Sequence, residues 1–63
     1  MYVVFFSTSN VFKAEEKFIS SGIECEVVPT PASDRAYCGV CIEVDNNTDL
    51  SVISDLEYAI MEG

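Results

Sequence analysis

The chain has 63 residues, 49% of them hydrophobic, with eleven acidic residues, three basic residues and no histidine, for a net charge of -8. This length predicts one domain over residues 1–63, with a small core that buries roughly 60% of the unfolded surface. Nucleic acid and anionic membranes attract clustered Lys and Arg, so this charge argues against both as partners. The apolar run 2–6 is too short for a signal peptide or a membrane helix, so we expect a cytoplasmic protein.

The first half of the chain predicts a strand, a helix and a second strand. Residues 2–7 are apolar and β-branched, which is typical of a buried strand. Residues 11–21 follow the helical period, and Gly22 suits the positive φ that ends a helix. Residues 23–27 alternate apolar and charged side chains, which predicts a strand with Cys25 on its covered face. The helix residues expected to face the core are Val11, Ala14, Phe18 and Ile19.

The second half predicts a third strand and a second helix. Residues 40–45 alternate, which places Cys41 on an open, acidic face of the sheet. Thr48 is the expected N-cap of a helix over 49–61, with Asp49 in its first turn. The apolar stripe of this predicted helix is Val52, Ile53, Leu56, Ala59 and Ile60.

This order of elements predicts an α+β fold of the ferredoxin-like type, βαββα. A right-handed crossover makes the first two strands parallel, and the third strand lies between them, antiparallel to both. The expected sheet therefore has three strands in the order 1-3-2, with both helices on one face. Because the apolar first strand would be an unprotected edge, we expect a homodimer, formed by edge pairing or through the open sheet faces.

The longest break in this pattern, 29–41, contains two cysteines at the spacing Cys38-Gly39-Val40-Cys41. A dithiol redox pair is one interpretation, but residues three apart on a strand point to opposite faces unless Gly39 bends the chain. A zinc site is another, but a closed site needs about four ligands, and the chain has three cysteines and no histidine. We therefore expect no cofactor and no metal.

A third interpretation is a single nucleophilic thiol. Cys38 lies at the end of the loop, next to a glycine that lets other groups approach, and Arg35 is the one basic residue in the loop. A nearby positive charge lowers the pKa of a thiol and increases the thiolate fraction. The simpler alternative, which the residues leave open, is a loop cysteine without a chemical role.

The order of motifs resembles a small bacterial family described as putative Se/S carrier protein-like. The resemblance rests on Ser7-Thr8 after the first strand, Gly22-Ile23 before the second, Val28-Pro29-Thr30-Pro31 after it, and Cys38-Gly39 nine residues beyond Pro29. It implies that Cys38 is the carrier thiol and that Gly39 is its partner in the motif. This chain has Ala32 where the family often has arginine, and Arg35 is the available substitute.

The resemblance implies a carrier that holds sulfur or selenium on Cys38 for transfer between a protein donor and a protein acceptor, rather than an enzyme with its own turnover. The alternative is a non-catalytic interaction or regulatory module in which the cysteines are incidental. A third possibility is a ligand-binding domain of the kind that ferredoxin-like folds support at dimer interfaces.

Overall fold

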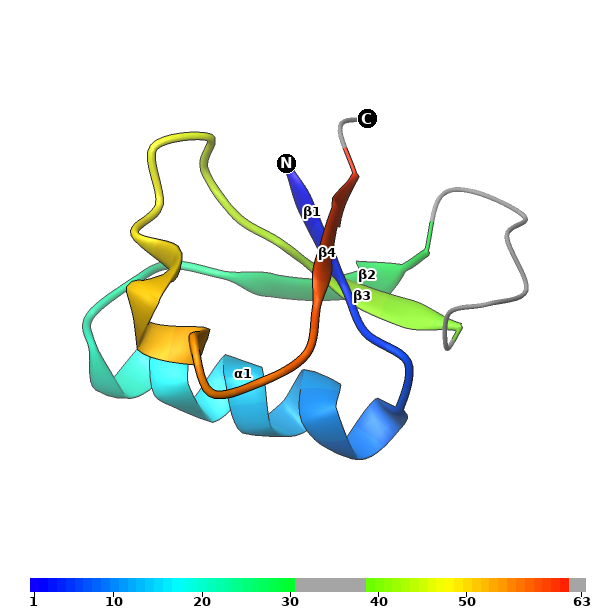
Figure 1. Cartoon of the computed structure of the whole chain (residues 1–63). Helices are drawn as coiled ribbons and strands as arrows, with labels where there is room; N and C mark the ends of the chain where they lie inside the picture. Colours follow the sequence, from blue (N-terminus) through cyan, green and yellow to red (C-terminus); the bar gives the residue numbers. More distant parts are fainter. Residues whose placement is uncertain (31–38, 62–63) are drawn as a thin grey trace.

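The computed structural model describes residues 1–30 and 39–61, in which one α-helix packs on one face of a four-stranded antiparallel sheet (Figure 1). The strand order is β2-β3-β1-β4. In chain order the elements are β1 (Tyr2–Val4), α1 (Thr8–Ser20), β2 (Glu26–Pro29), β3 (Val40–Glu43), the short 3-10 helix η1 (Leu50–Ile53) and β4 (Ala59–Met61). The α+β class is confirmed, and the predicted order of the first three strands is present within the larger sheet.

The prediction of a second α-helix over 49–61 is wrong. This segment forms only the single turn η1, followed by strand β4, which pairs with β1 in the register Val3↔Ile60. Serine and β-branched residues, which make up most of η1, are weak helix formers. A short helix would also leave the backbone of β1 unpaired on one side, whereas β4 completes its hydrogen bonding. The apolar residues of the predicted stripe are therefore divided mainly between η1 and β4.

The addition of β4 changes the position of β1 in the sheet. β1 pairs with β3 on one side and with β4 on the other, so it is an interior strand and not the edge that the sequence predicted. The two edges among the described strands are β2 and β4. As an interior strand, β1 therefore needs no second copy to protect it.

Helix α1 begins and ends where local chemistry favours it. The Ser7 hydroxyl accepts a hydrogen bond from the Asn10 backbone N–H at 3.3 Å, which satisfies one of the free donors of the first turn. At the other end, Gly22 has φ 74, and the Ile23 N–H donates to the Phe18 carbonyl at 2.9 Å. This reversal returns the chain toward the sheet, so that β2 starts close to the C-terminal end of α1.

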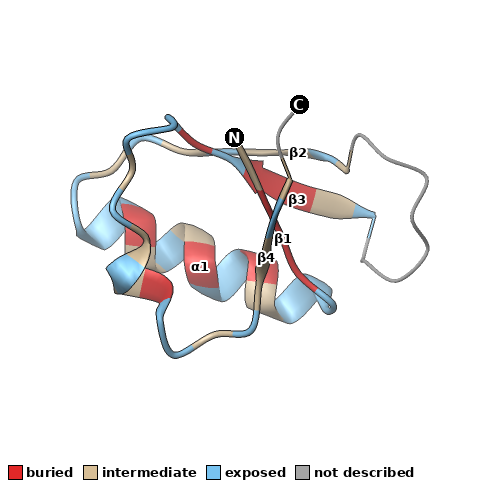
Figure 2. Cartoon of the chain, turned by 45° about the horizontal axis from the view of Figure 1, so that its top comes forward, coloured by how far each residue is buried: buried red, intermediate tan, exposed pale blue. Residues whose placement is uncertain are grey.

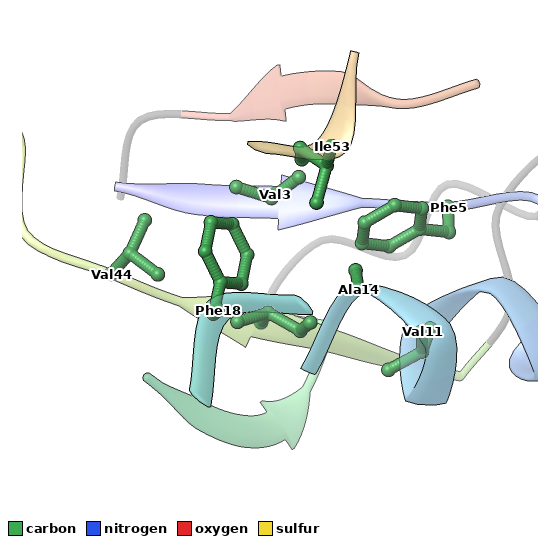
Figure 3. Close-up of a cluster of buried hydrophobic side chains, with 8 residues drawn as sticks. Val3, Phe5, Val11, Ala14, Phe18, Val44 and Ile53 are labelled. Atoms are coloured by element: carbon green, nitrogen blue, oxygen red, sulfur yellow. The ribbon is translucent and has the colours of Figure 1, made fainter. Parts of the chain in front are cut away.

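The core lies between α1 and the sheet (Figures 2 and 3). Val11, Ala14 and Phe18 are fully buried, as predicted, but Ile19 is 63% exposed and does not belong to the core. Ile19 lies about 100° around the helix from Phe18, and the sheet covers only the Phe18 side. The buried residues of this cluster are Val3, Phe5, Val11, Ala14, Phe18, Ile42, Val44 and Ile53.

The turn before η1 also differs from the prediction. Asp49, not Thr48, is the N-cap, and its carboxylate accepts a hydrogen bond from the Ser51 N–H at 2.9 Å. Hydrogen bonds from Ser51 hold the pKa of Asp49 below its usual value. Beyond η1, Asp55 forms an ion pair with Lys17 of α1 at 3.3 Å, which marks the flank of the helix that faces η1. Within the described residues, no helix is long and apolar enough to cross a membrane.

Candidate functional site

The predicted site residues fall at the junction of β2 and β3. Cys38 and Arg35 lie outside the described residues, whereas Gly39 is described and exposed. The backbone N–H of Thr30 donates to the Gly39 carbonyl at 3.1 Å. These two residues directly adjoin the last paired residues of the strands, Pro29 and Val40. The two ends of the segment that contains Cys38 are therefore held together by the sheet.

This end of the sheet also carries the start of α1. Because β1 runs antiparallel to β3, the end of β1 lies beside the start of β3, and α1 begins four residues after β1 (Figure 1). The first turn of α1 contains no acidic residue. The positive end of a helix dipole favours negative charge nearby. The first turn of α1 therefore adds no negative side-chain charge here, whereas four carboxylates of the described residues lie at the other end of the β2–β3 pair.

Those carboxylates surround an open hollow at the opposite end of the β2–β3 pair. Its volume is ≈ 450 Å³. Its lining residues are Glu24, Cys25, Glu26, Glu43, Val44 and Asp45. Four carboxylates disfavour a thiolate or any other anion there. Among the described residues, no group of three or more His, Cys, Asp or Glu side chains is placed to hold a metal ion.

Cys25 borders this hollow and packs partly against the core, on the covered face that the sequence predicted. Burial, and in second place the negative charge of Glu15, raise the pKa of the Cys25 thiol above its usual value. At neutral pH this thiol is therefore protonated. A protonated thiol is a poor nucleophile.

Cys41 is on the face of the sheet opposite α1, as its position in β3 predicted, but the prediction that this makes it open is wrong. Its side chain is 0% exposed, and its Sγ donates to the Pro29 carbonyl at 3.9 Å, a weak contact. Its cross-strand partner on β1 is Val4, which is 1% exposed. This face therefore has a small apolar centre, and Cys41 fills it as a hydrophobic residue.

Gly39 does not need to be glycine for the backbone that the structure describes. Gly22 is the glycine with positive φ in this part of the chain, and a Cβ added at Gly39 would meet no atom within 4 Å. The bend through Gly39 that a Cys38–Cys41 pair requires is therefore not supplied by a positive φ.

From this geometry we expect Gly39→Ala to fold normally. The change in the free energy of unfolding should be zero or a gain of up to about 1 kcal/mol, because alanine restricts the unfolded chain. Urea denaturation followed by circular dichroism measures it. A loss of more than about 1 kcal/mol would contradict this prediction, because it would mean that a Cβ at Gly39 strains the backbone or meets other atoms.

The comparison with protein families gives a match over almost the whole chain. The model of the family described as "Putative Se/S carrier protein-like" matches residues 1–58. No curated protein and no solved structure matches the chain. The matched range includes α1, strands β1 to β3 and the segment that carries Cys38. On this evidence, the chain belongs to the Se/S carrier protein-like family.

Proposed function

We propose that this protein carries sulfur or selenium on the thiol of Cys38 and passes it to a partner protein. The observation that carries the proposal is membership of the Se/S carrier protein-like family over residues 1–58. A carrier of this kind needs a protein donor and a protein acceptor. It performs no turnover of its own, and it works in the cytoplasm, where thiols stay reduced.

The two described cysteines support the assignment to Cys38. Cys25 has a raised pKa beside carboxylates, and Cys41 is fully buried. A carrier thiol must instead be reachable by two proteins and must be ionised at neutral pH. Arg35 is proposed to favour the thiolate of Cys38 through its charge, and Gly39 to leave space for the partner beside the sulfur.

The proposed loading step is an exchange at sulfur. The Cys38 thiolate attacks the outer sulfur of a persulfide on the donor protein, a new S–S bond forms, and the donor S–S bond breaks. The donor cysteine leaves as a thiolate, so electrons balance and no external oxidant is needed. In the delivery step an acceptor thiolate attacks the outer sulfur of the loaded carrier, the S–S bond to Cys38 breaks, and Cys38 leaves as a thiolate. A selenopersulfide would transfer selenium in the same way.

The first test is the reactivity of each thiol in the folded protein at neutral pH. We expect iodoacetamide to label Cys38 first, Cys25 more slowly and Cys41 only on unfolding. The rate at Cys25 should increase as the pH rises above 9, because only its thiolate reacts and its pKa is raised. Labelling is followed by mass spectrometry of proteolytic peptides. Equal rates at Cys38 and Cys25 would contradict the proposed role of Cys38.

The alternative function, a non-catalytic interaction module, has one observation in its favour. Phe12 and Ile19 of α1 are exposed by 54% and 63%, and exposed apolar side chains that share one side of a helix can form an interaction surface. This alternative predicts that Cys38→Ser leaves partner binding unchanged. Homodimerisation remains a prediction, to be checked by light scattering, and β4 and the sheet face opposite α1 are the surfaces available to it.

A further inference from the structure

Strand β2 is an edge of the sheet, and the hydrogen-bond register shows which of its backbone groups point outward. Thr30 donates to the Gly39 carbonyl, and antiparallel strands alternate bonded and non-bonded pairs. The backbone N–H and C=O groups of Val28 and Glu26, two and four residues before Thr30, therefore point toward β3. The N–H and C=O of Val27 point away from β3, in the direction in which a further strand would be added.

The flank of α1 on the β2 side carries two exposed apolar side chains, Phe12 and Ile19, with Glu15 between them. The Lys17–Asp55 ion pair marks the opposite flank, which faces η1. Glu15 lies on the β2 side, since its charge acts on Cys25 just before β2. Phe12 and Ile19, three residues before and four residues after Glu15, share its side of the helix. Both are more than half exposed.

The other face of the same edge is acidic. Glu26 lies directly across from Glu43, and like charges at this position destabilise a sheet. Glu24 and Asp45 line the same hollow, and no Lys or Arg is among its described lining residues. A cation placed beside β2 would relieve this repulsion.

We propose that the outer edge of β2, with the adjoining flank of α1, docks an extended segment of another protein in which apolar and basic residues alternate. A strand added to an edge points successive side chains to opposite faces. The apolar side chains of the docked segment would contact Phe12 and Ile19 on the α1 side of the sheet. Its basic side chains would contact Glu24 and Glu26 on the other face. This inference stands apart from sulfur transfer, because no cysteine chemistry enters it.

A second copy of this chain fits the same edge poorly. It would bring the same carboxylates into contact with Glu24 and Glu26, and each copy has a net charge of -8. The three basic residues of the chain are Lys13, Lys17 and Arg35, and none lies on β2. Charge complementarity therefore selects a basic partner.

The test uses the full chain and a fluorescent peptide of alternating lysine and valine, with binding measured by anisotropy. We expect it to bind more tightly than a peptide of the same composition in which the lysines and valines form separate blocks. Methylation of the amides along one edge of the peptide should abolish binding, whereas methylation along the other edge should not. Equal binding of the alternating and block peptides would overturn the proposal, because charge alone would then explain both.

A matched pair of variants tests the location. Glu26→Lys should weaken peptide binding about tenfold, because one attraction becomes a repulsion. It should not unfold the protein, since it also removes the Glu26–Glu43 repulsion. Glu57→Lys makes the same change of charge at an exposed position outside β2 and should have a much smaller effect. Equal effects of the two variants would contradict docking at β2, as would sedimentation showing that the free protein already self-associates through this edge.

Discussion

Replacing Phe18 by alanine is expected to leave most of the protein unfolded at room temperature. Phe18 is 0% exposed and lies between α1 and the sheet, beside Val3 and Val44 (Figure 3). Truncation of a buried phenylalanine costs about 3–5 kcal/mol. The core of a domain below roughly 70 residues rarely supplies more than about 3–5 kcal/mol. The loss and the total stability are therefore of the same size.

Phe12→Ala is the matched control, because it removes the same side chain from the same helix. Phe12 is 54% exposed, so its loss should change the free energy of unfolding by no more than about 0.5 kcal/mol. Urea denaturation followed by far-ultraviolet circular dichroism measures both variants. If the two variants had similar stability, the assignment of the core to the inner face of α1 would be incorrect.

The second large effect is expected from Cys38→Ser. Incubation of the wild-type protein with a cysteine desulfurase and cysteine should add the mass of one sulfur atom to the intact chain. The serine variant should add none, because a hydroxyl at neutral pH does not attack a persulfide. The fold of the variant should be unchanged, as its circular dichroism and urea midpoint will show. Loading of the serine variant to the wild-type level would refute the assignment.

Cys25→Ser is the control for that experiment. It removes a thiol with a raised pKa and should leave loading unchanged. Repeating the experiment with a selenium donor separates the two possible cargoes, because selenium adds a larger mass than sulfur. An interaction module without carrier chemistry would show no loading in the wild-type protein with either element.

The sequence predicts the parts of the fold that depend on strong local patterns. The alternation in 23–27 and 40–45 predicts two strands, and the right-handed crossover predicts their order with the first strand, β2-β3-β1. The helical stripe of α1 predicts the burial of Val11, Ala14 and Phe18. The C-terminal segment was less clear, because its apolar residues fit a helix and a turn followed by a strand equally well. The need of β1 for a second neighbour decided between them, and this need is a property of the whole sheet.

The candidate site was only partly accessible to sequence reasoning. Alternation placed Cys25 and Cys41 on opposite faces of the sheet, as the structure has them. It did not show that Cys41 is fully buried, because a strand residue on the uncovered face is exposed only when its neighbours are small or absent. The exposure of Ile19 was missed for a related reason: the width of a helix's buried stripe depends on what it packs against.

Cys38 is expected to hold the cargo, and locating the added sulfur in the wild-type protein tests this directly. Trypsin cuts after Lys17 and Arg35, which separates Cys25 from the peptide that contains Cys38 and Cys41. Fragmentation of that second peptide then distinguishes its two cysteines. We predict that the added mass lies on Cys38 after loading by a desulfurase. Added mass on Cys25 or Cys41, with Cys38 unmodified, would contradict the assignment of the cargo to Cys38.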